Sequence, residues 1–332
     1  MTPALGIDLA RGQVLDALRG SGRFLLVTHE HPDGDALGSL IGLHGVLTAL
    51  GKDAAMFLAA DELPLPSEYR FLALGPTVSE PPADLAERVI VFLDCGNVDR
   101  TPSGEARRDG ALVLNIDHHH DNTLFGDVDL VVPEASCTAE IVWELMGELG
   151  VAPTPEVAEA LYVGLVTDTG KFMYENTTPR AHAMAADLIA AGVDVHAVYR
   201  HLYEGIPAAK LRLLGRALER MDRYDDGGLT IVVIDGSDFD AAGATEEHTE
   251  GIVDHLRAVE GTRVAALARE RCEPGGEGRM KVSLRSADGL VDVSAIARAA
   301  GGGGHRQAAG FTTEMSADEL VAFLREQIDA QS

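Results

Sequence analysis

The chain has 332 residues, of which 46% are hydrophobic and 5% aromatic, and its formal net charge at pH 7 is −26. This length exceeds the roughly 100–150 residues of one typical core, so we expect two domains. The acidic excess opposes attraction to a long polyanion and argues against stable binding of long duplex nucleic acid. Any nucleic-acid substrate therefore has to be held locally.

Apolar segments and cysteines indicate where such a chain resides. No apolar run approaches the roughly 18 residues that a membrane-spanning helix needs, so we expect no membrane association. Asp8 and Arg11 interrupt the N-terminal segment where a secretory signal needs an apolar stretch, which favours a cytoplasmic location. Cys95, Cys137 and Cys272 lie far apart without a C-x-x-C pair, so they are predicted to be small core residues rather than disulfides or zinc ligands.

The first half of the chain alternates short apolar runs with helical stretches. The runs, each predicted to be a strand buried on both faces, cover residues 24–29, 54–59, 89–94 and 111–118. With helices such as 37–50 between them, they predict an α/β domain with a parallel sheet and helices on both faces. Functional side chains of such sheets collect at the carboxyl ends of strands. His29, Asp94 and Asp117 stand at the ends of these runs.

Helices and then a second mixed pattern follow. Helices are predicted at residues 137–149, 155–167 and 179–191. Residues 193–228 read as a mostly helical connection, so the expected parts are a first domain 1–192, a linker 193–228 and a second domain 229–332. In the last part we expect strands at 229–235, 263–270, 280–286 and 308–313, and helices near 247–259, near 292–300 and from Ser316 onward. This pattern predicts a smaller mixed α/β domain.

The segment H-E-H-P-D-G-D at residues 29–35 follows the first apolar run, where a strand turns into a helix. Imidazole and carboxylate ligands together suit a hard or borderline divalent ion such as Mn²⁺. Because Pro32 and Gly34 tighten the turn, Asp33 and Asp35 can point to neighbouring positions. The alternative is a helix N-terminus capped by a carboxylate, with the histidines exposed to solvent.

Two further acidic residues and a histidine run complete the candidates. Asp94 ends the run 89–94, and Asp117 precedes three consecutive histidines at 118–120. A buried imidazole needs polar partners and an exposed run of histidines has no structural purpose, so a functional role is favoured. Asp168 interrupts an otherwise apolar helix. Its simpler interpretation, like that of Asp94, is an acidic residue at the end of an element.

In this order, the segments resemble the DHH phosphoesterase superfamily, whose name stands here at residues 117–119. Residues 282–286 (V-S-L-R-S) and the glycines 301–304 with His305 look like motifs of the companion DHHA1 domain. Residues 176–180 (N-T-T-P-R) are similar to a segment of the bacterial group that degrades nanoRNA and 3′-phosphoadenosine 5′-phosphate. The resemblance covers nearly the whole chain and implies a DHH domain with a parallel sheet, followed by a mixed-sheet DHHA1 domain.

This resemblance implies two divalent metal ions, with Mn²⁺ the expected metal. One ion would be held by His29, Asp33 and Asp94, and the other by Asp35, Asp94, His118 and Asp168. Asp94 would then bridge two cations about 3.5–4 Å apart, which lower the pKa of a shared water and stabilise charge on the phosphoryl group. His119 would contact that group, and Asp117 would orient a histidine rather than bind metal.

In the second domain the resemblance implies a set of substrate-binding residues, which are Arg285, Ser286, Gly302, Gly303, Gly304 and His305. Glycine permits a close approach of the backbone to an anion, and Arg285 and His305 can supply charge-assisted bonds to phosphate. Such a clamp would explain how an acidic protein holds a nucleotide. The alternative is a flexible loop before a strand.

Two other motifs imitate parts of this sequence. The family usually has Asn at position 31, and with His31 the segment begins like the metallo-β-lactamase motif H-x-H-x-D-H. That fold requires His at position 34, which is Gly, and leaves Asp35 unexplained. Gly170-Lys171 imitates a P-loop, but Phe172 replaces the required Ser or Thr, so a kinase is excluded.

The leading hypothesis is an enzyme that removes nucleotides from short oligoribonucleotides, with 3′-phosphoadenosine 5′-phosphate as a further substrate. A phosphodiesterase for cyclic di-AMP or pApA is the main alternative. A manganese pyrophosphatase, a hydrolase with the metallo-β-lactamase fold and an inactive nucleotide-binding regulator are weaker ones. The glycine-rich second domain argues against the pyrophosphatase, and the complete ligand set argues against the regulator. The sequence leaves open the preferred substrate, the cleavage polarity, the native metal and whether the protein forms a homodimer.

Overall fold

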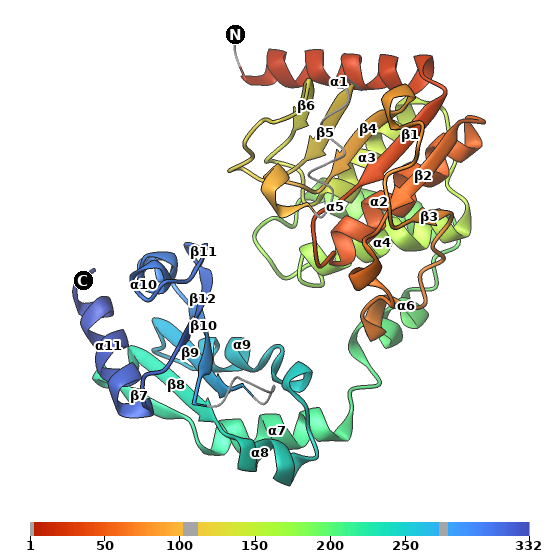
Figure 1. Cartoon of the computed structure of the whole chain (residues 1–332). Helices are drawn as coiled ribbons and strands as arrows, with labels where there is room; N and C mark the ends of the chain where they lie inside the picture. Colours follow the sequence, from red (N-terminus) through yellow and green to blue (C-terminus); the bar gives the residue numbers. More distant parts are fainter. Residues whose placement is uncertain (1–2, 102–111, 272–277, 332) are drawn as a thin grey trace. The chain divides into compact units, whose positions relative to one another are not determined.

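A computed structural model of the protein describes residues 3–101, 112–271 and 278–331. The chain forms two compact units, Met1–Gly205 and Ile206–Ser332 (Figure 1). Of the range 193–228, expected to be a helical connection, α6 (Val195–Tyr203) belongs to the first unit and α7 (Ala208–Glu219) to the second.

Parallel strands form the sheet of the first unit, in the order β3-β2-β1-β4-β5-β6. They are β1 (Arg23–Val27), β2 (Asp53–Phe57), β3 (Thr77–Val78), β4 (Val89–Leu93), β5 (Val113–Asp117) and β6 (Val128–Val131). The chain runs outward from β1 to β3 and then returns to place β4 on the other side of β1 (Figure 1). In sheets of this kind, ligands bind at the carboxyl ends of the strands where the order reverses, here β1 and β4.

Side chains alternate along these strands. Those of β4 and β5, and all of β1 after Arg23, are buried on both faces, as predicted, whereas β2, β3 and β6 are only partly buried. Phe24 and Leu26 join the core formed with the helices, whereas Leu25 and Val27 point into a smaller core on the opposite face. The helices are α1 (Pro3–Gly20), α2 (Gly34–Ala49), α3 (Thr138–Glu148), α4 (Pro155–Asp168) and α5 (Pro179–Ala190). In the described part of the chain, the smaller core packs under the 3₁₀ segments η3 (Leu85–Glu87) and η4 (Val98–Arg100).

A mixed sheet forms the second unit, in the order β11-β12-β10-β9-β8-β7, with β8 and β9 parallel and the other pairs antiparallel. Its strands are β7 (Asp222–Tyr224), β8 (Leu229–Ile234), β9 (Val264–Glu270), β10 (Met280–Ser286), β11 (Gly303–His305) and β12 (Ala308–Thr313). One face packs on α10 (Val293–Ala299) and α11 (Ala317–Asp329), and the other on α7, α8 (Gly236–Ala242) and α9 (Ile252–Arg257). The predicted α/β class with a mixed second sheet is therefore confirmed.

Most predicted elements lie within a few residues of the observed ones, with two kinds of difference. The helix predicted near 247–259 is divided into η6 (Glu246–Thr249) and α9, because Gly251 between them has φ of +85°. The helices α1 and α8 and the short strands β3, β6, β7 and β11 were not predicted. The other 3₁₀ segments are η1 (Ala60–Glu62), η2 (Ser67–Tyr69) and η5 (Asp225–Gly227). Ser316 forms the predicted capping box with Glu319.

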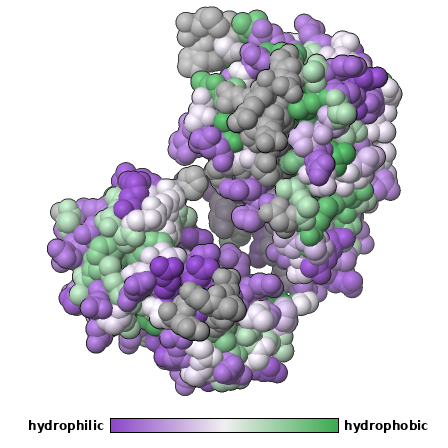
Figure 2. Space-filling model, viewed as in Figure 1, coloured by the Kyte–Doolittle hydropathy of each residue, from purple (hydrophilic) through white to green (hydrophobic). Residues whose placement is uncertain are grey.

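Among the described residues, no single helix is long and apolar enough to cross a membrane, and only α5 and α6 pass as a pair, with a bend of 112° between them. Figure 2 shows hydrophilic and hydrophobic side chains interspersed on the face in view. Cys95 and Cys137 are buried, as predicted, and Cys272 lies outside the described residues.

Candidate metal centre

The candidate ligands meet at the reversal of strand order in the first sheet. His29 lies two residues after β1, Asp94 directly follows β4, and Asp117 is the last residue of β5. Because these three strands are neighbours in the sheet, their carboxyl ends place the three side chains side by side. Asp94 is 3% exposed and has φ of +57°, a left-handed conformation that is uncommon outside glycine and concentrates at functional sites.

The turn from β1 into α2 supplies two more carboxylates. Asp33 is the N-cap of α2 and accepts hydrogen bonds from the backbone N–H groups of Asp35 and Ala36 through Oδ1. The predicted alternative, a helix cap, is thus correct for one oxygen of Asp33. Asp35 is 1% exposed. A Cβ atom on Gly34 would lie 2.3 Å from Thr167 Oγ1, so glycine is needed to bring this turn against the end of α4.

The end of α4 brings in the last candidate, Asp168, which is the final residue of that helix. Gly164, one turn earlier, allows α2 and α4 to approach, because a Cβ atom there would lie 2.9 Å from Asp35 Oδ1. Two helices thus place Asp35 and Asp168 beside the strand-end residues.

Three groups of side chains have nitrogen and oxygen atoms that all lie within 4.8 Å of one another. They are His29, Asp33 and Asp94; Asp35, His118 and Asp168; and Asp94, His118 and His119. The structure therefore brings together all six residues predicted as metal ligands. The first group is the set predicted for one ion. The second group contains three of the four residues predicted for the other ion, and the fourth, Asp94, is grouped instead with His118 and His119.

The two histidines in the first two groups are oriented by backbone carbonyl oxygens. His29 Nδ1 lies 2.8 Å from the oxygen of Glu30, and His118 Nδ1 lies 3.4 Å from the oxygen of Ala135. The opposite ring atoms, Nε2, face carboxylates: His29 Nε2 is 3.6 Å from Asp94, and His118 Nε2 is 3.7 Å from Asp94. This arrangement, with Nδ1 held by a carbonyl and Nε2 directed to the ligand set, is typical of metal-binding histidines.

His119 differs from His118 in its partner. Its Nδ1 lies 2.7 Å from Asp117 Oδ1, and Asp117 also accepts a hydrogen bond of 2.6 Å from Asn122 Nδ2. The hydrogen bond with Asp117 raises the pKa of His119 to about 9. Asp117 is completely buried and therefore fixes the imidazole of His119, which keeps Nε2 as the ring nitrogen available to a further group.

The electrostatics of this cluster test whether a cation fits. Burial raises the pKa of Asp35, and the charges of Asp94 and Asp168 raise it further. Burial likewise raises the pKa of Asp168 to about 6, although His118 opposes the rise. For Asp94, burial is outweighed by the hydrogen bond from His29 and by the charges of His119 and His118, which lower its pKa to about 2. Crowded carboxylates that destabilise each other, next to imidazole nitrogens, are a donor set that divalent cations would relieve.

Thr138 contacts this centre and was not predicted from the sequence. Thr138 at the start of α3 donates a hydrogen bond of 3.0 Å from Oγ1 to Asp94 Oδ1, and its backbone N–H donates to Asp35 Oδ2. It lies 44 residues from Asp94 and 103 from Asp35 along the chain. Its complete burial together with polar bonding would have been a signal, but burial of a single threonine cannot be read from the sequence.

His31 and His120 stay outside the cluster. The side chain of His31 is 90% exposed and its nearest acidic partner is Glu62, at 3.5 Å from Nδ1. His120 is exposed, and neither histidine joins a ligand group among the described residues. The metallo-β-lactamase interpretation, which requires His31 as a ligand, is therefore not supported.

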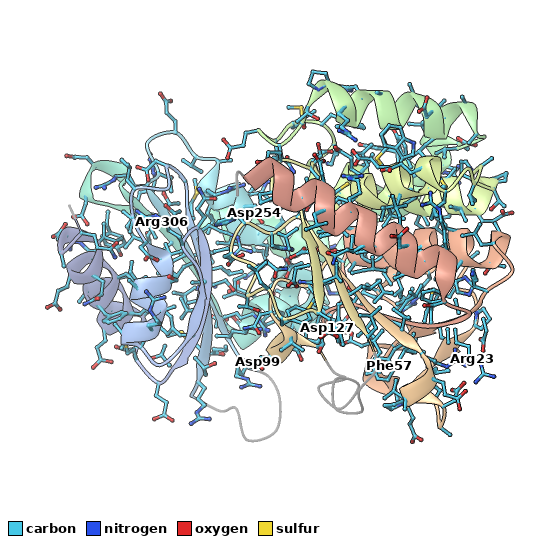
Figure 3. The ribbon with its side chains drawn as sticks, turned by 90° about the horizontal axis from the view of Figure 1, so that it is seen from above. Arg23, Phe57, Asp99, Asp127, Asp254 and Arg306 are labelled. Atoms are coloured by element: carbon cyan, nitrogen blue, oxygen red, sulfur yellow. The ribbon has the colours of Figure 1, made fainter. Side chains whose placement is uncertain are left out.

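The predicted substrate-binding residues of the second unit lie around one edge of its sheet. Arg285 on β10 and His305 on β11 both pair with Ala308 of β12, so these three positions form one row across the sheet. Arg285 is half-buried, and its Nε lies 3.6 Å from Asp254 on α9, labelled in Figure 3. Ser286 is buried and accepts a hydrogen bond from the backbone N–H of Gly289, which gives it a place in a turn.

Strand packing explains part of the glycine run. A Cβ atom on Gly302 would lie 2.2 Å from the oxygen of Gly310, and one on Gly304 would lie 2.6 Å from that of Ala308. Gly304 also has φ of +136°, which only glycine adopts readily. Gly303, by contrast, has nothing within 4 Å of such an atom. Within the run, β12 therefore requires Gly302 and Gly304 but not Gly301 or Gly303.

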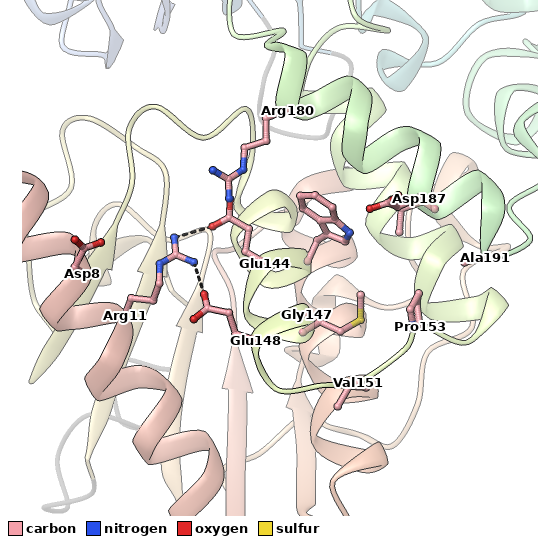
Figure 4. A pocket seen from close by; sticks show the side chains of 13 residues that line it. Asp8, Arg11, Glu144, Gly147, Glu148, Val151, Pro153, Arg180, Asp187 and Ala191 are labelled. Carbon is pink, nitrogen blue, oxygen red and sulfur yellow. Dashed lines mark hydrogen bonds and ion pairs between the residues drawn. The ribbon is translucent and has the colours of Figure 1, made fainter.

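A cavity of about 750 Å³ lies elsewhere in the first unit, between α1, α3 and α5 (Figure 4). Arg11 pairs there with Glu144 and Glu148, at 2.7 and 3.1 Å, and Arg180 also pairs with Glu144. None of the predicted ligands lines this cavity. Its ion pairs link α1 and α5 to α3.

Two family sequence models match the chain. The N-terminal domain of the DHH family matches residues 23–165, and the DHHA1 domain matches residues 227–330. The first match contains the strand-end residues His29, Asp94 and Asp117, and the second contains the row that includes Arg285.

Individual proteins agree with these matches. The bifunctional oligoribonuclease and PAP phosphatase NrnA of Thermus thermophilus is 37% identical over 301 residues, which cover 90% of this chain and 86% of that protein. The cyclic-di-AMP phosphodiesterase GdpP of Geobacillus thermodenitrificans is 26% identical over 93% of this chain, but over 47% of its own length. An exopolyphosphatase-related protein of Bacteroides fragilis has the same fold, with a TM-score of 0.83, 23% identity and coverage of 97% of this chain and 96% of that one.

Proposed function

We propose that this chain, which belongs to the DHH phosphoesterase family and carries a DHHA1 domain after its DHH domain, hydrolyses short oligoribonucleotides and 3′-phosphoadenosine 5′-phosphate. The observation that carries the proposal is that three clusters, each made of carboxylate and imidazole side chains, meet where the strand order of the first sheet reverses. The similarity to a bifunctional oligoribonuclease and PAP phosphatase over most of both chains supports the substrate class.

The proposed cofactor is a pair of divalent ions, with Mn²⁺ the expected metal because the donors are imidazole and carboxylate. One ion would be held by His29, Asp33 and Asp94, and the other by Asp35, Asp94, His118 and Asp168. Such a pair activates water at neutral pH and stabilises charge on phosphoryl oxygens. Because both ions would bind the carboxylate of Asp94, this residue would fix the position of one ion relative to the other.

The protein's own groups orient the substrate. His119 is fixed through Nδ1 by Asp117, so Nε2 can donate a hydrogen bond to a phosphoryl oxygen. Asn122 holds the other oxygen of Asp117 and keeps the Asp117–His119 pair in place. Because Asp117 is buried and bonded on both oxygens, it is assigned to positioning and not to metal binding.

The second unit would hold the part of the nucleotide remote from the scissile bond. Arg285 and His305 stand at positions of one row across its sheet, and arginine and histidine are residue types that can form charge-assisted bonds to phosphate. Gly303, whose glycine identity packing does not explain, is the position at which the backbone can approach an anion. Local positive charge of this kind is needed in a chain with a net charge of −26.

Hydrolysis of cyclic di-AMP or pApA is the second candidate, because this chain is also similar to a cyclic-di-AMP phosphodiesterase. This chain spans less than half of that protein, whereas it spans most of the oligoribonuclease relative. The proposal therefore ranks short RNA and 3′-phosphoadenosine 5′-phosphate first. The proposal includes a cytoplasmic location. It also leaves a homodimer open, and light scattering after size-exclusion chromatography would distinguish a homodimer from a monomer.

One assay tests the substrate class. The purified chain with Mn²⁺ is incubated separately with 3′-phosphoadenosine 5′-phosphate, labelled RNA of two to five nucleotides, a long RNA, cyclic di-AMP and pyrophosphate. We expect release of mononucleotides from the short RNA series and of phosphate from 3′-phosphoadenosine 5′-phosphate, with little turnover of the long RNA. Turnover confined to cyclic di-AMP or to pyrophosphate would contradict the proposal.

A further inference from the structure

We propose that Thr138 and Asn176 are positioning residues of the metal centre, with Thr138 fixing Asp94 and Asp35, and Asn176 fixing Asp168. This inference deepens the proposed function and depends on it for the identity of the ligands. Neither residue has an acidic or imidazole group, so neither can replace a ligand. Each acts through the carboxylate that it holds.

The start of α3 provides the first half of this arrangement. The N-cap residue Cys137 makes no side-chain hydrogen bond to the helix, so the first N–H groups of α3 need another acceptor. Asp35 supplies it, because Oδ2 accepts from the N–H of Thr138 at 2.6 Å and Oδ1 accepts from that of Ala139 at 2.9 Å. A buried carboxylate is thereby held on both oxygens by a rigid element, and the positive end of α3 favours its charged form.

Thr138 adds a bond to the carboxylate assigned as shared. Its Oγ1 donates to Asp94 Oδ1 at 3.0 Å, and both residues are almost fully buried. The backbone directly after β4 fixes the Cα–Cβ direction of Asp94, but the torsion that turns an Asp carboxylate is broad, so the backbone alone does not set the direction of its oxygens. The hydroxyl of Thr138 fixes one oxygen and thus the direction of the remaining lone pairs.

Asn176 performs the corresponding task at Asp168. Its Nδ2 donates to the backbone oxygen of Ser136 at 2.8 Å and to that of Asp168 at 3.1 Å, and it lies 3.4 Å from Asp168 Oδ2. Ser136 Oγ returns a hydrogen bond of 2.7 Å to the backbone oxygen of Asn176. These bonds tie the last residue of α4 to the segment that precedes α3.

The orientation of the Asn176 amide follows from its neighbours. Two carbonyl oxygens face the amide nitrogen, so the opposite orientation would place oxygen against oxygen. In this orientation Oδ1 is buried and has no hydrogen-bond partner among the described residues.

The same network explains the sequence motif at residues 176–180, to which the proposed reaction assigns no role. Thr178 caps α5 by accepting from the N–H of Ala181, and Arg180 pairs with the buried Glu140 at 3.4 Å. Glu140 in turn accepts from the N–H of Ser136 at 3.2 Å. Asn176 therefore links Ser136 to Asp168, and Arg180 contacts the same segment through Glu140. We call Ser136, Glu140, Asn176 and Arg180 together the brace.

The two residues have different expected effects, because Asp94 belongs to both proposed ion sites and Asp168 to one. Thr138→Val keeps the shape and removes the hydroxyl, and it should weaken both Mn²⁺ sites by about 10–100-fold. Asn176→Leu should weaken one site by about 10–100-fold and spare the other. Thr138→Ser keeps a hydroxyl at this position, so it should retain most of the wild-type affinity for Mn²⁺. Ser136→Ala, a milder change in the same brace, should weaken the site of Asp168 less than Asn176→Leu does.

The experiment is a titration of the metal-free full-length chain with Mn²⁺, followed by electron paramagnetic resonance of the free ion, together with the melting temperature of each metal-free variant. Thr154→Val is the matched control, because Thr154 caps the far end of α4 and touches no ligand. It should lower the melting temperature without changing Mn²⁺ affinity.

Wild-type affinity in both Thr138→Val and Asn176→Leu would overturn the inference, as would an equal loss of affinity in Thr154→Val. Should Thr138→Val or Asn176→Leu fail to fold, wild-type affinity in Ser136→Ala would overturn the assignment of Asn176, and wild-type affinity in Thr138→Ala that of Thr138. A wild-type chain that binds one Mn²⁺ would contradict the two-ion proposal while still testing Thr138 at that site. A wild-type chain that binds none would overturn both.

Discussion

The two motif-bearing regions of the molecule are built in opposite ways. At the metal centre, Asp35 and Asp94 are almost fully buried, and their oxygens are held by backbone and hydroxyl donors of another helix. At the glycine-rich edge of the second sheet, Arg285 is half-buried next to Asp254. Gly304 there is explained by its contact with β12.

This difference shows what a motif can establish alone. Burying several carboxylates together is unfavourable unless something compensates for their charge, so the first region implies a ligand from its own composition. Glycines are required wherever strands approach closely, so the second region has a structural explanation that competes with binding. The predictions below test whether the first region performs the chemistry and the second one the binding.

The largest effect is expected at the shared carboxylate. Asp94→Asn preserves size and tolerates the left-handed backbone at this position, but it removes the charge assigned to both ion sites. We expect kcat/KM for 3′-phosphoadenosine 5′-phosphate to fall by more than about 100-fold. This exceeds the loss of about 10–100-fold that is usual when a residue that only orients a metal ligand is removed. Asp117→Asn, measured in the same assay, should cost less. An Asp94→Asn enzyme as active as the Asp117→Asn enzyme would remove the basis for a bridging ligand.

A smaller and selective effect is expected in the second unit. Arg285→Ala or His305→Ala should reduce kcat/KM for a dinucleotide by about tenfold or more, equivalent to about 1.5–3 kcal/mol for a charge-assisted bond. Turnover of bis-p-nitrophenyl phosphate, which has no second phosphate, should be unchanged.

Arg279→Ala provides the control for Arg285→Ala, because it removes an equal charge whose present partner is the exposed Glu314. It should leave both substrates unaffected. An equal fall for ester and dinucleotide in the Arg285 variant would assign this residue to the metal centre instead.

The glycine run offers a comparison within one motif. Gly304→Ala forces a Cβ atom against β12 at a positive φ and should lower the free energy of unfolding by about 1–3 kcal/mol. Gly303→Ala should change stability little, because its Cβ atom has open space. Urea denaturation of both variants checks this difference. Equal destabilisation would mean that Gly303 is also a packing residue, which would weaken its proposed role at a phosphate.

The smallest effect is expected at His31. Its side chain is exposed and its backbone has φ of +56°, a conformation that Asn adopts more readily than most residues. His31→Asn should therefore leave Mn²⁺ binding and activity unchanged. Loss of one bound Mn²⁺ in this variant would support the metallo-β-lactamase arrangement.

Much of the first unit could be predicted because its sequence signals are local. The runs that became β1, β4 and β5 are apolar and end in polar residues, so both the strands and the candidate site residues at their ends follow from the pattern. The short β6 has only four residues and contains Asp129, which gives no continuous apolar signal. The helix α1 has no acidic residue in its first turn to mark its start, and it too was not predicted.

The positioning residues could not be found in this way. Thr138 meets its carboxylates across 44 and 103 residues of chain, and Asn176 meets Ser136 across 40. Threonine, serine and asparagine are common in turns and caps, so their types carry no signal without the tertiary contacts. The candidate ligands were predicted because their motifs resemble those of a known family, whereas Thr138 and Asn176 were given no role by that resemblance.

The central claim, that two ions share Asp94, is tested most directly by a crystal of the protein grown with Mn²⁺ and measured at the manganese absorption edge. The account predicts two anomalous peaks about 3.5–4 Å apart. One peak should contact His29, Asp33 and Asp94, and the other should contact Asp35, Asp94, His118 and Asp168. A single peak, or a peak bound to His31 and not to Asp94, would contradict it.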